Sequence, residues 1–178
     1  MRIIVILMSL IVTFGTHATE RDKVAKHYVA AIVSHDFEQV AEFIHPDALA
    51  VFKQKVDNAL QSSKQNLVEK ELLPLLGVDS RQQAAELTAK QAYINFSQSL
   101  MAKFPNQDIE IANSSVEYLG EVTHGDIIAV TYKMTFNISG KSASNIVQHH
   151  FKKYQDSWRI LLTPETLVYF EQYTSPNR

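Results

Sequence analysis

The stretch DIIAVTYKMTFNI, residues 126–138, decides the fold class, because apolar and polar side chains alternate along it. The apolar positions are Ile128, Val130, Tyr132, Met134 and Phe136. The positions between them are mostly polar and include Thr131, Lys133 and Thr135. A period of two is that of a β-strand, whose successive side chains point to opposite faces of a sheet. The stretch therefore predicts a strand with one face toward the core and the other toward water.

Three more segments extend this strand into a sheet. Residues 109–122 precede it, and their alternation slips near Asn113 to Ser115, which predicts a bulge. Residues 142–154 and 157–163 follow it, separated by turns at 139–141 and 155–156. Four consecutive strands joined by short turns predict an antiparallel meander.

The chain before residue 105 has helical spacing. Apolar residues recur every three or four positions within residues 20–35, 36–45, 46–60, 67–77 and 80–103. Asp36 and Asp47 stand where helix N-termini need acceptors, and Ser80 with Gln83 predicts a capping box that opens one long helix. A short helix that starts at Pro164 ends the chain. This order predicts an α+β fold, with N-terminal helices packed on a curved, antiparallel, four-stranded C-terminal sheet.

Residues 1–18 have the layout of a secretory signal peptide. Arg2 supplies a positive charge, residues 3–14 are apolar, and small or polar residues follow up to Ala18, after which we expect cleavage. An uncleaved anchor is the alternative, but the apolar run is shorter than the roughly 20 residues that span a bilayer. We expect a periplasmic or secreted protein without stable membrane insertion. Its residues 19–178 are predicted to form a single domain, in which residues 66–105 are an extended helical segment.

Charge and cysteine content exclude several classes of function. The formal net charge is −2, with both signs interspersed, whereas nucleic-acid-binding proteins carry clustered basic surfaces. The absence of cysteine excludes disulfides, thiol catalysis and thiolate metal sites. The sequence also lacks the glycine-rich loops of nucleotide-binding enzymes and the histidine motif of zinc proteases. We therefore predict no cofactor and no nucleic-acid partner.

His149 and His150 are the first candidates for chemistry, because imidazole titrates near neutral pH. Adjacent side chains on a strand point to opposite faces, so the pair cannot chelate one ion, and we predict no metal site. His149 shares a face with Val147. If this face is the concave one, His149 could act as a base beside Tyr132 or Tyr28. The alternative is a core histidine whose ring is satisfied by a neighbour.

A set of packing and capping positions carries a resemblance to a known family: Tyr28, Ala31, Asp36, Val40, Phe43, His45, Pro46, Asp47, Ala48, Asp156, Trp158 and Ile160. With three long strands between them, they resemble the cystatin-like α+β cone superfamily of nuclear transport factor two, steroid delta-isomerase and polyketide cyclases. ELLPLLGVDS (71–80), VEYLGEVTHGD (116–126) and WRILLTPE (158–165) are similar to small exported bacterial proteins of unknown function. The resemblance implies a cone-shaped fold that hosts both enzymes and binding proteins.

Three functions follow from these patterns as alternatives. The first is a non-catalytic module that binds an apolar small molecule or an envelope protein, with ligand contacts from Val130, Tyr132, Met134, Phe136, His149 and Trp158. The second is a small isomerase, dehydratase or hydrolase that uses a histidine and a tyrosine in the cavity. The third is a cell-envelope assembly domain with residues 66–105 as its contact. Lysine and threonine on the other face of the sheet predict a monomer or a weak homodimer.

Overall fold

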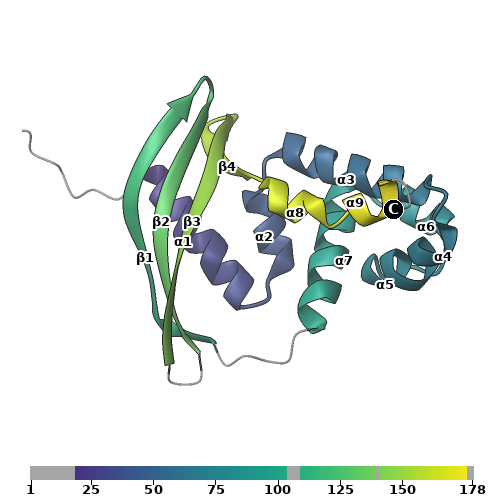
Figure 1. Cartoon of the computed structure of the whole chain (residues 1–178). Coiled ribbons are helices and arrows are strands. Elements are labelled where there is room, and N and C mark those ends of the chain that lie inside the picture. The colour runs from purple at the N-terminus through teal and green to yellow at the C-terminus, as the bar shows by residue number, and fades with distance from the viewer. Residues whose placement is uncertain (1–18, 104–108, 139–140, 176–178) are drawn as a thin grey trace, which may run out of the picture.

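The computed structural model describes residues 19–103, 109–138 and 141–175. Most helices come first and a four-stranded antiparallel sheet follows, which confirms the predicted α+β fold class (Figure 1). The predicted signal peptide lies outside the described residues. The prediction of a single domain stays a prediction.

The elements have the following bounds. The helices are α1 (Glu20–Val33), α2 (Phe37–Phe43), α3 (Pro46–Leu60), α4 (Gln65–Leu67), the π-helix η1 (Val68–Leu72), α5 (Leu73–Leu75), α6 (Arg81–Glu86), α7 (Ala89–Ala102), α8 (Pro164–Val168) and α9 (Glu171–Thr174). The strands are β1 (Ile109–His124), β2 (Ile127–Ile138), β3 (Lys141–Tyr154) and β4 (Ser157–Leu161).

The strands form the predicted meander, in the order β1-β2-β3-β4, with each strand antiparallel to the next. The register of β1 against β2 shifts between Glu110 and Ser115, across the position of the predicted bulge. A second shift lies between Tyr118 and Gly120 and was not predicted. Leu119 lies at this second irregularity, where an extra residue bends the strand and increases its twist.

Helix α1 lies across one face of the sheet, which we call the inner face (Figure 1). The inner-face residues include Val130, Tyr132, His149, Phe151 and Ile160. The opposite, outer face carries Val122, Thr131, Lys133, Ile146 and Gln148, and these side chains are exposed or partly exposed. No described helix covers the outer face in Figure 1. The alternation of residues 126–138 thus separates a buried face from a solvated one.

The free edge of β4 is covered by the connection between α2 and α3. Ile44 pairs with Ile160 as an isolated parallel bridge, and the amide of His45 donates a hydrogen bond to the carbonyl of Ile160 at 2.8 Å. Unpaired backbone groups on an edge strand invite pairing with other chains, so this contact protects the edge. It also fixes where α3 starts relative to the sheet.

Phe52 of α3 is the centre of the helical part of the core, and its side chain is fully buried. Its ring meets those of Tyr93, Phe96 and Phe170 edge-on, with centroids 5.4, 5.5 and 5.2 Å away. Tyr93 and Phe96 belong to α7, and Phe170 lies between α8 and α9. Tilted and edge-on aromatic pairs at this spacing add to the stabilisation from buried area. The cluster therefore joins three parts of the chain that are far apart in sequence.

The helical segment 66–105 contributes to the same core. Val68, Leu72, Leu75 and Leu76 are almost completely buried. Gly77 follows with a φ of +66°, a left-handed conformation that favours glycine after a helical turn. The segment therefore carries core residues of its own, and its use as the contact of an assembly domain stays a prediction.

Two predicted helices are broken in the structure. The helix expected from Ser80 to Lys103 divides at Leu87, whose backbone is extended, and restarts at Thr88. There the hydroxyl of Thr88 accepts from the amide of Gln91, while the Gln91 side chain accepts from the amide of Thr88. This complete capping box starts a new helix at Thr88. At the predicted box, Ser80 accepts from the amide of Gln83, but the Gln83 side chain accepts from the amide of Asp79, so that box is only half formed. The last helix is likewise divided into α8 and α9.

The cap of α3 was also predicted wrongly. His45, not Asp47, is the N-cap residue, because Pro46 occupies the first helical position. The Nδ1 atom of His45 accepts a hydrogen bond from the amide of Asp47 at 3.1 Å. At α2 the prediction is confirmed, since the carboxylate of Asp36 accepts from the amide of Gln39 at 3.0 Å.

We expect Phe52→Ala to lower the free energy of unfolding by about 3–5 kcal/mol, because it leaves a cavity among three aromatic rings. The neighbouring Val51 is exposed on the same helix, so Val51→Ala is a matched control that should change stability by less than about 1 kcal/mol. Urea denaturation of both variants measures the difference. Equal losses would contradict the central position of Phe52.

Candidate functional site

The predicted catalytic residues lie together between α1 and the inner face. Tyr28 comes from α1, Tyr132 from β2 and His149 from β3. The His149 ring is 5.6 Å from the Tyr28 ring and 6.0 Å from the Tyr132 ring, measured between centroids. The expectation that His149 points toward aromatic neighbours therefore agrees with its position. Whether these residues have a catalytic role stays a prediction.

Hydrogen bonding does not connect the three residues. The hydroxyl of Tyr132 donates to Oδ1 of Asp22 at 3.0 Å, and Asp22 lies in the first turn of α1. The Nε2 atom of His149 is buried and has no hydrogen-bond partner within the described part of the chain. Sequence reasoning missed Asp22, although Thr19 and Asp22 have the spacing of a capping box. Tyr132 is thus paired with the carboxylate of Asp22, while His149 has no such partner within the described residues.

Burial determines the protonation states in this cluster. It lowers the pKa of His149 to about 4, with a smaller contribution from His150. Burial also raises the pKa of Tyr132 above its ordinary value, and the carboxylate of Asp22 adds to this shift. The pKa of Tyr28 is raised by burial and by the neighbouring Tyr93. At neutral pH the three side chains are therefore uncharged, and His149 is a weak base.

The predicted ligand-binding residues are mostly packed by the chain itself. Val130, Tyr132 and Met134 are buried, the first two within the main core beneath α1. The ring of Trp158 is half-buried, with the guanidinium of Arg21 5.0 Å and the ammonium of Lys153 5.5 Å from its centroid. The side chain of Phe136 lies outside the described part of the structure. The inner face thus serves as an interior surface for α1.

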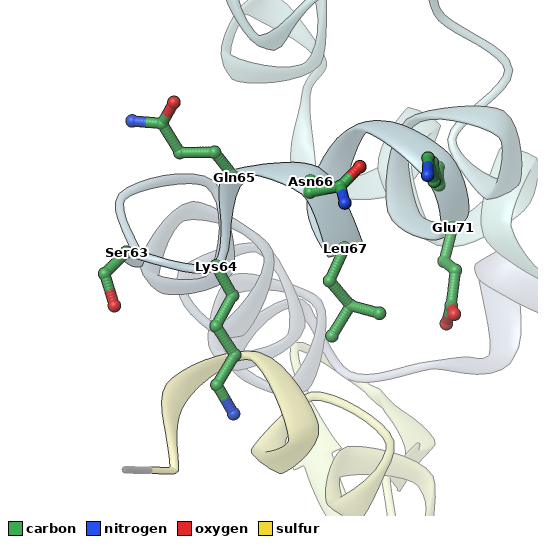
Figure 2. Close-up of a pocket in the computed structure, with 7 residues that line it drawn as sticks. Ser63, Lys64, Gln65, Asn66, Leu67 and Glu71 are labelled. Atoms are coloured by element: carbon green, nitrogen blue, oxygen red, sulfur yellow. The ribbon is translucent and has the colours of Figure 1, made fainter. Parts of the chain in front are cut away.

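An open hollow lies at the opposite end of the molecule from the sheet, beside α4 (Figure 2). It has a volume of about 560 Å³ and is lined by Ser63, Lys64, Gln65, Asn66, Leu67, Lys70 and Glu71. The side chain of Lys64 points from this segment toward the C-terminal helices and donates to the carbonyl of Gln172 at 2.7 Å. The lining mixes both charge signs, and Lys64 is engaged in holding the C-terminal segment. These groups do not define a ligand.

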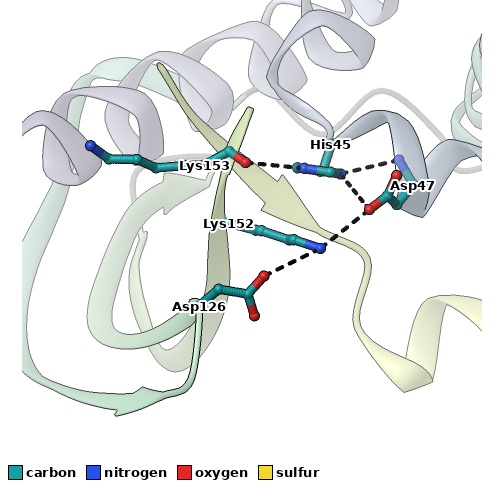
Figure 3. Close-up of polar contacts among 5 residues, drawn as sticks. All are labelled: His45, Asp47, Asp126, Lys152 and Lys153. Carbon is teal, nitrogen blue, oxygen red and sulfur yellow. Dashed lines mark hydrogen bonds and ion pairs between the residues drawn. The ribbon is translucent and has the colours of Figure 1, made fainter. Parts of the chain in front are cut away.

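A polar network surrounds His45, whose side chain is buried (Figure 3). Its Nδ1 atom accepts from the amide of Asp47, so Nε2 carries the proton and lies 3.4 Å from the carbonyl of Lys153. The ammonium of Lys152 bridges the carboxylates of Asp47 and Asp126 at 3.3 and 3.4 Å. These two carboxylates raise the pKa of Lys152. The network joins the start of α3 to the turn between β1 and β2 and to the end of β3.

Within the described residues no group of three or more histidine, cysteine, aspartate or glutamate residues has the arrangement to hold a metal ion. Over the same ranges no helix has the length and apolar character needed to cross a membrane.

Comparison with known proteins does not place the chain in a family. No family model matches, and no curated protein matches. A solved structure that resembles the chain is the solution structure of a SEC-C motif containing protein from Rhodopseudomonas palustris. It has a TM-score of 0.40 and 13% identity over 79% of this chain and 74% of that one. Such a low TM-score establishes neither a shared fold nor a shared function.

The predicted membership of the cystatin-like cone superfamily was therefore wrong. No family model and no curated relative supports this membership, and none supports the likeness to small exported bacterial proteins. The residues that suggested it explain the error. Asp36 and His45 are helix caps, and Val40 is a packing position, and such features recur in unrelated folds.

We expect His149 to make stability depend on pH. Its pKa of about 4 in the folded protein lies below the unfolded value of about 6.5, so the unfolded chain binds more protons between these limits. The unfolding free energy is therefore unaffected by the titration of His149 above about pH 6.5. It falls by about 2–3 kcal/mol as the pH is lowered from 6.5 to 4. His149→Leu should flatten this part of the profile of unfolding free energy against pH. His124→Leu, at an exposed imidazole on β1, is the control and should leave the profile unchanged.

We expect His45→Ala to lower the unfolding free energy by about 2–3 kcal/mol, because it removes both a helix cap and a buried ring. His45→Asn keeps an acceptor for the amide of Asp47 and should lose less. Asp36→Ala removes a cap from an exposed side chain and should cost only about 1 kcal/mol. Thermal unfolding of the three variants compares them. A loss in His45→Ala no larger than that in Asp36→Ala would show that burial of the ring adds nothing.

Proposed function

We propose that the protein is an exported, non-catalytic interaction module that binds a protein partner of the cell envelope through the outer face of its sheet. The observation that carries this proposal is the contrast between the two faces. Helix α1 lies over the inner face, and Val130, Tyr132 and Phe151 beneath it are fully buried. The outer face has no such cover among the described elements.

The outer face and its edge hold exposed apolar side chains. Ile146 on β3 is 65% exposed, and Val122 on β1 is 54% exposed. Of the seven large apolar side chains found exposed in the described residues, five lie on β1 or β3, and Val122 and Ile146 are on the outer face, whereas Tyr118 pairs with Tyr132 on the inner face. Scattered exposed apolar residues are normal, but their concentration on one sheet is a feature of interaction surfaces.

The composition of this face favours a reversible protein contact. Thr131, Lys133 and Gln148 lie between the exposed apolar positions. Obligate interfaces have apolar centres depleted of charge, whereas transient interfaces resemble the rest of the surface and use a few apolar anchors. We expect the partner to present an apolar side chain to Ile146 and an acceptor or carboxylate to Lys133.

The enzymatic alternative has less support. Catalysis by His149 would need a hydrogen-bonded acid or nucleophile beside it, and its buried Nε2 atom meets none among the described residues. Its pKa of about 4 also makes it a weak base at neutral pH. Export rests on the charge and the apolar run of residues 2–14, which favour a periplasmic or secreted location.

Site-specific photocrosslinking in the native host tests the proposed surface. A photoreactive amino acid at position 146 should give one discrete adduct with an envelope protein. The same group at position 51, an exposed apolar site on α3, should give none. Val122→Lys combined with the probe at 146 should abolish the adduct, while Val168→Lys, on α8, should not.

Each outcome bears on the proposal. Adducts at both 146 and 51, or at neither, would contradict a partner at the outer face. An adduct with twice the mass of the chain would identify the occupant as a second copy. The predicted monomer or weak homodimer would then need revision, and light scattering at micromolar concentration would measure the new state.

A further inference from the structure

The first turn of α1 is joined to the middle of the sheet by one carboxylate. Oδ2 of Asp22 accepts from the backbone nitrogen of Thr19 at 2.8 Å, and Oδ1 accepts from the hydroxyl of Tyr132 at 3.0 Å. The hydroxyl of Thr19 accepts in return from the amide of Asp22 at 3.3 Å, which completes a capping box. Tyr132 is fully buried at the centre of the inner face. Asp22 therefore connects the helix cap to the core.

The predicted signal peptide ends next to this cap. Hydrolysis of the bond between Ala18 and Thr19 by a signal peptidase adds water across it. The hydroxyl stays on the carbonyl carbon of Ala18, which leaves as a carboxylate, and Thr19 keeps the nitrogen as an amine. A terminal amine has an ordinary pKa of about 7.7–8.0, so it is protonated at neutral pH. The nitrogen that the structure places 2.8 Å from Asp22 would then carry a full positive charge.

We propose that the chain is cut between Ala18 and Thr19, and that the new α-ammonium of Thr19 forms an ion pair with Asp22 that secures α1 on the sheet. The inference rests on the proposed export and is independent of the proposed protein partner. The carboxylate of Asp22 already accepts a charge-assisted hydrogen bond from the amide of Thr19, and a protonated amine in place of the amide adds Coulomb attraction between two full charges. An ammonium at a helix N-terminus is opposed by the helix dipole, and the carboxylate of Asp22 offsets this repulsion.

The structure distinguishes this cut from its neighbours. A cut one residue later would remove Thr19 and with it both hydrogen bonds of the capping box. A cut earlier would leave Thr19 with an ordinary amide, which carries no charge. Only cleavage directly before Thr19 keeps the cap and adds the charge to it.

The first experiment is the intact mass of the protein recovered from the envelope of its host. We expect a chain that begins at Thr19. A mature chain that begins at any other residue would overturn the proposal, whatever partner the outer face binds. Recovery of only the full-length, uncut chain would also overturn it.

The second experiment measures melting temperatures of four purified proteins. Two begin at Thr19, and two carry a Gly-Ser extension before Thr19 that removes the charge from its nitrogen. One protein of each kind has Asp22 and the other has Asp22→Asn. In the chains with Asp22 we expect the extension to lower the melting temperature by about 1–4 °C, as for a partly exposed ion pair. In the Asp22→Asn chains the extension should have no effect.

The dependence on pH distinguishes an ion pair from a cap made only of hydrogen bonds, because only the ion pair is lost when the amine is deprotonated. The ion pair stabilises the fold while the amine is protonated, so the difference between the two Asp22 chains should disappear at about pH 10–11. Tyr132→Phe is a further control, since it removes the other hydrogen bond of Asp22 and should leave the effect of the extension in place. Equal melting temperatures of the two Asp22 chains at pH 7, or an equal drop in the Asp22→Asn pair, would overturn the ion pair.

Discussion

One backbone hydrogen bond, from the amide of His45 to the carbonyl of Ile160, sets where α2 and α3 lie against the sheet. Together with the bridge between Ile44 and Ile160, it makes the α2–α3 connection a short extension of the sheet beyond β4. From that point α2 contacts β4 and α7, and α3 runs toward the aromatic cluster around Phe52. His45 is buried because it lies where the α2–α3 connection meets the edge of β4.

The regular parts of this fold could be predicted from the sequence, and the breaks could not. The alternation of Val130, Tyr132 and Met134 gave the strand and its buried face, because a period of two leaves little choice of orientation. The break before Thr88 was not predicted, because the helical spacing of apolar residues continues through it. That spacing does not show that a second helix begins at Thr88. His45 rather than Asp47 is the N-cap because Pro46 is the first residue of α3. The sequence alone did not show at which residue this helix begins.

Sequence reasoning also found the members of the inner cluster without finding their use. It named Tyr28 and Tyr132 as possible neighbours of His149, and both rings do lie beside that of His149. It could not tell whether the space between them would be a cavity or a packed interface, because that depends on how closely α1 approaches the sheet. The contact between Tyr132 and Asp22 spans 110 residues, and no local pattern encodes such a distance. The cone-family resemblance failed for a related reason, since caps and core positions specify packing without specifying ancestry.

The half-buried position of Trp158 has a spectroscopic consequence. It is the only tryptophan of the chain, and its ring lies beneath the guanidinium of Arg21, a residue of α1. The wavelength and yield of indole fluorescence depend on neighbouring charges and on contact with water. Arg21 must leave the ring when α1 departs from the sheet, whereas the strands that hold Trp158 can stay paired. The intrinsic emission of this protein therefore reports on the docking of one helix, and no added label is needed to observe it.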